Sequence, residues 1–250
     1  MRGWAGRNPT LIGLVALGVL NHVTLAGNRV TASLEALRMG ASPAVVGVLL
    51  ALYALLPMFC AVGVGRLSDR IGVRRPMLVG SIGLMLGSAL PALVPGFAAL
   101  FASACLMGVS FMPFQVPAQN ATGELGTAEE RPHNFSTLAL GYAISGFFGP
   151  LVAGLTIDHG GFTMSFALLA LLPIVPAVAL GRGRLALPGP HPSHAEGPPR
   201  RALELVRHRQ LRRVLVLNLM FSMAWELHTI VIPVYGARIG LSASEIGFVL

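Results

Sequence analysis

Residues 65–78 read Gly65-Arg66-Leu67-Ser68-Asp69-Arg70-Ile71-Gly72-Val73-Arg74-Arg75-Pro76-Met77-Leu78, a short run with four arginines and one aspartate. Residues 43–64 before it and residues 76–123 from its end onward contain no Asp, Glu, Lys or Arg. An uncharged apolar stretch of about 18 or more residues is long enough to cross a bilayer as a helix. A short arginine-rich connection between two such helices lies on the cytoplasmic side. The run therefore predicts a membrane-spanning hairpin with its turn in the cytoplasm.

The composition extends this interpretation to the whole chain. Hydrophobic residues make up 54% and charged residues 11%, with a mean hydropathy of +0.71. A soluble domain has about 25% charged residues. The apolar residues stand in long blocks and not in amphipathic stripes, so they face lipid or other spans. We therefore expect an all-α, multi-pass protein of the inner (cytoplasmic) membrane.

The net charge of +8 raises the question of nucleic-acid binding, which the placement of the charges answers. All 18 basic residues are arginine. Fifteen of them fall in the N-terminal segment or in connections predicted to be cytoplasmic, and only Arg29, Arg38 and Arg238 fall elsewhere. This asymmetry follows the positive-inside rule. It predicts a cytoplasmic N-terminus next to membrane lipid and requires no nucleic acid.

Hydropathy and turn residues predict seven complete spans and the start of an eighth. Residues 1–180 are expected to form a six-helix bundle, residues 181–213 a basic cytoplasmic linker, and residues 214–250 the incomplete start of a second bundle. Within the linker, Arg201–Arg213 fits either a short basic helix on anionic headgroups or a solvated chain. The predicted spans cover residues 9–37, 43–64, 76–90, 97–116, 135–157, 162–180 and 214–235, with a cytoplasmic loop at 117–134 and an outer turn at 158–161.

An internal repeat supports this map. Residues 38–47 match residues 238–247 at a constant offset of 200, with Arg, Gly, Ser, a β-branched residue and Gly at the same five positions. The first copy connects the first two predicted spans, and the second copy connects the seventh span to the eighth. The repeat therefore predicts two related halves, each beginning with the same helical hairpin.

The run at 65–78 resembles the G-x-L-x-D-R-x-G-R-[RK] signature of the major facilitator superfamily of secondary transporters. The resemblance implies two homologous six-helix halves, so the chain looks truncated early in its eighth helix. It also implies a protein that moves a small-molecule substrate by alternating access, with a proton as the candidate coupling ion, and that is a monomer when full length. A membrane fragment or half-unit without transport activity of its own is the alternative.

In such transporters the signature forms a gate on the cytoplasmic side, where its aspartate pairs with a helix of the second half that this chain lacks. The resemblance assigns this role here to Gly65, Asp69, Arg70, Gly72, Arg74 and Arg75. We expect Asp69 to accept backbone N–H groups at a helix start. For Arg74 and Arg75, simple topogenic charge is the alternative.

The predicted span 135–157 is rich in small residues. It resembles the glycine-proline motif of the drug-efflux branch of the family, which favours export. Small residues also let helices approach closely, so ordinary packing is the alternative. The residues concerned are Gly141, Gly146, Gly149, Pro150 and Gly154.

Charged residues at membrane depth are costly and mark candidate functional sites. Arg29 lies nine residues before Arg38, or about 14 Å inward at 1.5 Å per residue. The same arithmetic from Arg238 puts Glu226 about 18 Å and His228 about 15 Å inward. We therefore predict that Arg29 faces Glu226 and His228 across a central cavity, to bind substrate or to couple protons. A structural ion pair, or an arginine that extends outward, is the alternative.

Asn21 and His22 lie deeper on the same predicted helix. Either residue fits a cavity-lining position, and a packed, hydrogen-bonded role is the alternative. We include Asn21 among the candidate substrate or coupling residues.

No motif for catalysis or for a cofactor is recognisable. The sequence has no nucleophile elbow, P-loop, His-Glu-x-x-His or paired-cysteine motif, so we expect neither an enzyme nor a cofactor. Cys60 and Cys105 fall inside predicted spans, far from any metal-ligand spacing, and are expected to be small buried side chains.

Overall fold

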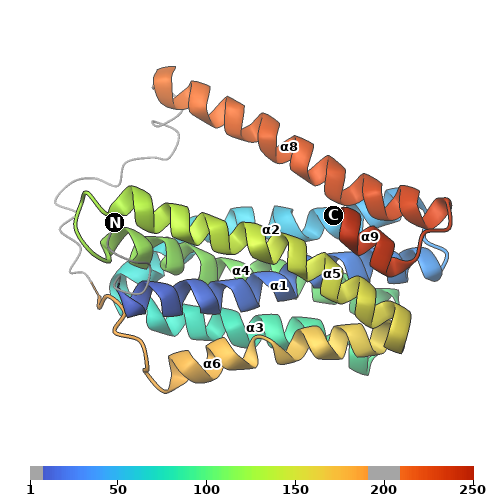
Figure 1. Ribbon diagram of the computed structural model, residues 1–250, viewed down its shortest axis with the longest axis horizontal. Coiled ribbons are helices and arrows are strands. Elements are labelled where there is room, and N and C mark those ends of the chain that lie inside the picture. Colours follow the sequence, from blue (N-terminus) through green and yellow to red (C-terminus); the bar gives the residue numbers. More distant parts are fainter. Residues whose placement is uncertain (1–7, 191–208) are drawn as a thin grey trace.

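The computed structural model describes residues 8–190 and 209–250, and every regular element in this part of the chain is an α-helix (Figure 1). The elements are α1 (Pro9–Arg38), α2 (Pro43–Ile71), α3 (Arg74–Leu93), α4 (Phe97–Glu124), α5 (Arg131–Leu171), α6 (Ile174–Gly181), α8 (Arg209–Arg238) and α9 (Ala243–Val249).

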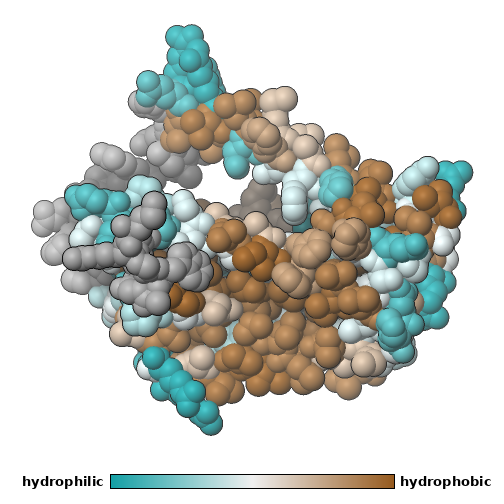
Figure 2. Space-filling model, in the orientation of Figure 1, coloured by the Kyte–Doolittle hydropathy of each residue, from teal (hydrophilic) through white to brown (hydrophobic). Residues whose placement is uncertain are grey.

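The predicted all-α membrane fold is confirmed. The stretches α1, α2, α3, α4, α5–α6 and α8 are each long and apolar enough to cross a membrane. Within α5–α6 the backbone leaves helical geometry at Gly161 (φ 77°), and the chain turns back there, so this stretch crosses twice (Figure 1). Hydrophobic residues cover the middle of the face seen in Figure 2, and hydrophilic residues gather toward its two ends. We call the end with the arginine-rich turn at 65–78 the loop end, and the opposite end the outer end.

Polar side chains hold α1 against α3 in a fixed register. The amide of Asn21 donates to the Ser81 hydroxyl (2.9 Å) and that of Asn28 to the Ser88 hydroxyl (3.1 Å). Both pairs are separated by 60 residues, and all four side chains are fully buried. A seven-residue step is two helical turns, so the two parallel helices repeat the same contact. Such interhelical hydrogen bonds are a common means of helix association in membranes.

Small residues bring α1 against α5. A Cβ atom at Gly149 would lie 2.7 Å from Ala26 Cβ and 3.0 Å from the Gly27 nitrogen. A Cβ at Gly27 would in turn lie 2.8 Å from the Gly149 carbonyl oxygen. The two backbones are therefore nearly in contact, which only glycine at these positions allows.

The two copies of the internal repeat form the same turn. Gly40 (φ 86°) ends α1 and Gly240 (φ 83°) ends α8, both in the left-handed region that favours glycine. The Ser42 hydroxyl accepts from Val45 N, and the Ser242 hydroxyl accepts from Glu245 N in the same way. The backbone bond from residue 41 to residue 36 recurs between residues 241 and 236. The two helical hairpins thus begin alike.

Several helices extend beyond their predicted ends. Helix α2 continues seven residues past Val64 to Ile71, and α4 continues eight residues past Val116 to Glu124. The predicted loop 117–134 shrinks to residues 125–130. Hydropathy marks where the apolar stretch stops, but a helix can continue into the polar region beyond the bilayer as long as its own hydrogen bonds persist.

The segment after α6 differs from the solvated linker that we predicted. Leu185 and Leu187 pack on the core formed by α1, α3, α4 and α6 at the loop end, and Pro190 lies against Gly72. Residues 191–208, and with them most of the predicted basic helix Arg201–Arg213, lie outside the described residues. Residues from Arg209 onward belong to the first turn of α8.

Candidate functional site

A central cavity of about 60 Å³ lies between α1, α5 and α8. It is lined by residues of all three helices, among them His22, Arg29, Gly146, Pro150, Trp225 and His228. His22, Leu25, Ala26 and Arg29 follow the spacing i, i+3, i+4, i+7 and therefore occupy one face of α1. The cavity thus joins the first half of the repeat to the start of the second.

An ion pair connects α1 and α8 beside this cavity. The guanidinium of Arg29 donates two hydrogen bonds to the Glu226 carboxylate, with nitrogen–oxygen distances of 2.5 and 3.3 Å. The Arg29 side chain is 13% exposed and that of Glu226 is 37% exposed. Paired geometry of this kind is how charged side chains are tolerated at membrane depth. The structure therefore brings together the two charges that the sequence placed at similar depth.

The surroundings of Arg29 hold it in place. Its guanidinium carbon lies 6.0 Å from the centre of the Tyr53 ring, and the Tyr53 hydroxyl donates to Asn28 Oδ1. Its Nε atom is buried without a hydrogen-bond partner in the described part of the chain. Arg29 thus depends on the Glu226 carboxylate for the neutralisation of its charge, since a buried cation without its counterion is strongly unfavourable.

The other predicted cavity residues divide into two groups. His228 lines the cavity from α8, as the depth argument expected. Asn21 does not line it, because its amide points to Ser81 on α3. The reason is helical phase: Asn21 and Asn28 share the face toward α3, whereas His22 and Arg29 share the face toward the cavity. His22 is therefore the cavity residue that our candidate set left out.

The small residues of α5 have different neighbours along the helix. Gly141 and Gly149 face α1, where a Cβ would lie 2.7 Å from Val15 and from Ala26, respectively. Gly146 has no heavy atom within 4 Å of such a Cβ and borders the cavity. Gly154 and Pro150 lie against α9, because a Cβ at Gly154 would clash with the Ala243 carbonyl, and one at Gly247 with the Pro150 carbonyl.

The positions of the signature residues at the loop end differ from those that we predicted. Asp69 lies in the last turn of α2 and not at a helix start, so the predicted capping role is wrong; α2 ends two residues later, before Gly72 (φ 81°). Asp69, Arg70 and Arg75 are exposed, and Gly65 is half-buried, where a Cβ would make an ordinary 3.9 Å contact with Val116. The signature contains four arginines, at 66, 70, 74 and 75. In the described part of the chain, Arg74 is the one whose side chain donates hydrogen bonds to another helix.

Arg74 caps the C-terminus of α6. Its Nε donates to the Leu180 carbonyl (2.6 Å) and a terminal nitrogen donates to the Gly181 carbonyl (3.0 Å). The last carbonyls of a helix lack partners within the helix and carry partial negative charge, so a guanidinium stabilises them. Arg74 thereby fixes the end of the first bundle to the start of α3.

We expect Arg74→Gln to lower the free energy of unfolding by about 1 kcal/mol, because two charge-assisted hydrogen bonds at a solvent-accessible site are lost. The matched control is Arg75→Gln, which removes an exposed arginine from the neighbouring position. Unfolding of the two purified variants in the same detergent measures the difference. Equal stability of the two variants would show that the cap is not energetically significant.

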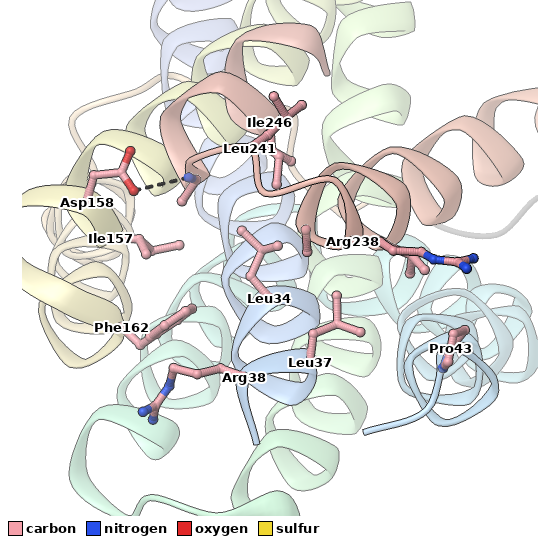
Figure 3. Close-up of a pocket in the computed structure, with 13 residues that line it drawn as sticks. Leu34, Leu37, Arg38, Pro43, Ile157, Asp158, Phe162, Arg238, Leu241 and Ile246 are labelled. Atoms are coloured by element: carbon pink, nitrogen blue, oxygen red, sulfur yellow. Dashed lines mark hydrogen bonds between the residues drawn. The ribbon is translucent and has the colours of Figure 1, made fainter. Parts of the chain in front are cut away.

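A larger cavity of about 570 Å³ lies at the outer end, between α1, α5, α8 and α9 (Figure 3). Its lining includes Leu34, Leu37, Leu241 and Ile246, while Arg38 and Arg238 at its rim extend away from each other. Asp158 accepts hydrogen bonds from Ala243 N (3.1 Å) and Ser244 N (2.8 Å) at the start of α9. The outer ends of the two halves are therefore tied together. We take the smaller, central cavity as the candidate functional site because it is lined by Arg29, the buried member of the ion pair, together with His22 and His228.

Neither cavity has the features of a metal centre. Among the described residues there is no group of three or more His, Cys, Asp or Glu that could hold a metal ion. Cys60 and Cys105 are free and half-buried in that part of the structure.

Comparison with known proteins agrees with this architecture. The sequence model of the Major Facilitator Superfamily matches residues 12–250. Over 110 residues the chain is 34% identical to the class C tetracycline resistance protein of Escherichia coli, covering 44% of this chain and 27% of that protein. Over 131 residues it is 29% identical to the multidrug efflux pump LfrA of Mycolicibacterium smegmatis, covering 52% of this chain and 26% of that protein.

Two solved structures that share this fold are those of transporters. One is a POT family transporter in complex with 5-aminolevulinic acid, with a TM-score of 0.69 at 18% identity, covering 98% of this chain and 50% of that one. Another is the peptide transporter POT in complex with sulfate, with a TM-score of 0.67 at 21% identity, covering 93% and 48%. The chain thus spans about half the length of these transporters.

The bundle of membrane-spanning helices has the fold of these solved structures. The chain belongs to the Major Facilitator Superfamily, since the match to the family covers nearly all of it. It is a multi-pass membrane protein of a family of transporters.

Proposed function

We propose that this chain forms the first bundle and the start of the second bundle of a proton-coupled transporter that exports a small molecule by alternating access. The observation that carries the proposal is the Arg29–Glu226 pair, because it joins the two halves beside the central cavity. The tetracycline resistance and multidrug efflux relatives support export.

The arrangement of the helices supports an inward-facing state. Helix α8 diverges from the bundle toward its N-terminal end and approaches it toward its C-terminal end, where α9 packs on α5 (Figure 1). The Asp158 contacts tie α5 to α9 at the outer end. With the loop end in the cytoplasm, as the arginine distribution predicts, the cavity opens inward. Access from the other side requires the Asp158 contacts to break and α8 to approach the bundle at the loop end.

The ion pair suggests how a proton could be coupled to this movement. Protonation of Glu226 removes the negative charge that neutralises Arg29, which weakens the link between α1 and α8 and frees the guanidinium for a substrate group. Loss of the proton restores the pair. The two protonation states thus favour different separations of the two halves, as a coupled cycle requires.

The test is a flux assay with the full-length protein that contains these residues, in proteoliposomes under an imposed pH gradient, with tetracycline and ethidium as probes. We expect gradient-driven flux of at least one probe, and at least a tenfold loss in Glu226→Gln. The control Glu129→Gln changes an exposed carboxylate in the connection between α4 and α5 and should leave flux unchanged. Flux that persists in Glu226→Gln would remove the coupling role. Absence of gradient-driven flux for both probes in the wild-type full-length protein would contradict proton-coupled export.

A further inference from the structure

His22 occupies a constrained position on the wall of the central cavity. Its ring contacts two aromatic rings in tilted arrangements, with centroid distances of 5.1 Å to Tyr142 and 5.6 Å to Phe111. Its Nδ1 atom lies 2.8 Å from the Ser145 hydroxyl oxygen on α5. The ring contacts and the hydrogen bond hold the ring with its Nδ1 edge toward α5.

The neighbours of Ser145 favour one direction for this hydrogen bond. The Ser145 hydroxyl lies 2.9 Å from the Tyr142 carbonyl oxygen, to which it can donate its single proton. A serine that donates there accepts from His22 through its oxygen, with the proton on Nδ1. This arrangement satisfies both contacts of the Ser145 hydroxyl at once. It favours the Nδ1–H tautomer of a neutral His22, in which Nε2 keeps a free lone pair.

His22 is one of the residues that line the cavity. Its Nε2 atom has no hydrogen-bond partner among the described residues, and this atom is not fully buried. The same cavity is lined by Arg29 and His228, and by Trp225 with its large aromatic surface. Arg29 is a pure hydrogen-bond donor, so the wall of α1 presents a donor and an acceptor two helical turns apart.

We propose that Ser145 holds His22 in the Nδ1–H form so that Nε2 accepts a hydrogen bond from an N–H or O–H group of the transported molecule. The ligand class is a small molecule that carries a hydroxyl, amide or ammonium donor. This proposal rests on the proposed function, because it assigns a substrate-recognition role to the same cavity. It makes His22 a specificity-determining residue, since a site with a fixed acceptor rejects analogues that lack the matching donor.

The tautomer can be read directly from the ring nitrogens. The full chain is labelled with ¹⁵N-histidine in lipid nanodiscs, and the His22 signals are assigned by their loss in His22→Asn. We expect a protonated Nδ1 and an unprotonated Nε2. Ser145→Ala removes the acceptor and should shift the ring toward the Nε2–H form. A protonated Nε2 in the neutral ring of the wild-type protein would overturn the proposal.

The ligand role is tested on the same sample. Tetracycline and ethidium carry N–H donors, whereas tetraphenylphosphonium is a cation with neither an N–H nor an O–H group. We expect tetracycline or ethidium to move the Nε2 signal of His22, and tetraphenylphosphonium to leave it in place. If neither donor-bearing probe moves the signal, or if all three move it equally, the recognition role is overturned.

Two substitutions separate recognition from packing. His22→Gln places an amide oxygen near the position of Nε2, whereas His22→Asn can still donate to Ser145 but leaves the acceptor position empty. We expect binding of the donor-bearing probe to be at least fivefold weaker in His22→Asn than in His22→Gln. Equal binding by the two variants would overturn the acceptor role. If the signal shift persists while the flux assay fails, the proposed transport function fails and the assignment of His22 stands.

Discussion

Truncation of Glu226 to alanine is expected to destabilise the protein more than truncation of Arg29 to alanine. The first change leaves a guanidinium that is 13% exposed without its counterion, whereas the second leaves a carboxylate that is 37% exposed and reaches water more easily. Breaking a fully buried pair costs about 3–5 kcal/mol. Partial exposure reduces this, so we expect about 2 kcal/mol for Glu226→Ala and about 1 kcal/mol for Arg29→Ala.

The measurement is the free energy of unfolding of each variant in mixed detergent micelles. Glu129→Ala, in the exposed connection between α4 and α5, controls for the loss of a carboxylate. A Glu226→Ala protein as stable as this control would contradict a structural link between α1 and α8. A larger loss in Arg29→Ala than in Glu226→Ala would mean that Glu226 is the more poorly solvated partner, contrary to the structure.

The second large effect is expected at Gly149. A Cβ there would lie 2.7 Å from Ala26 Cβ and 3.0 Å from the backbone of α1, so the two helices must separate. Overpacking of this kind costs about 1–3 kcal/mol, and we expect Gly149→Ala to fall at the upper end because the obstacle includes backbone.

The matched variant is Gly146→Ala, three residues earlier on the same helix. No heavy atom lies within 4 Å of a Cβ at that position. The change should therefore be neutral or stabilising by up to about 1 kcal/mol, which is the helix-propensity gain of alanine over glycine. Unfolding curves of the two proteins provide the comparison. Equal effects would show that α1 and α5 do not approach as closely as the structure indicates.

The spans and the depth of the charges were predictable because they depend on composition alone. An arginine such as Arg29 stands out in an uncharged stretch, and counting residues from Arg38 gives its depth without any knowledge of packing. The repeat at 38–47 and 238–247 then placed Glu226 at a similar level. These arguments need only the helical rise and the thickness of the bilayer.

Helix phase and helix ends could not be predicted in the same way. The spans are apolar on all sides, so periodicity does not show that Asn21 faces α3 and that His22 faces the cavity. The signature at 65–78 gave no indication that Asp69 would lie inside α2 or that Arg74 would cap α6, because the partners of Arg74 lie more than 100 residues away. These placements depend on tertiary packing.

The most direct test of the link between the two halves exchanges its charges in one chain. Arg29→Glu alone and Glu226→Arg alone each place like charges against one another, and we expect both to lower stability and flux. The double variant restores opposite charges, and we predict that it regains most of the stability lost in the single variants. Distant, independent sites do not show such a coupling, because their effects add. A double variant that loses the sum of the two single effects would contradict a contact between these side chains.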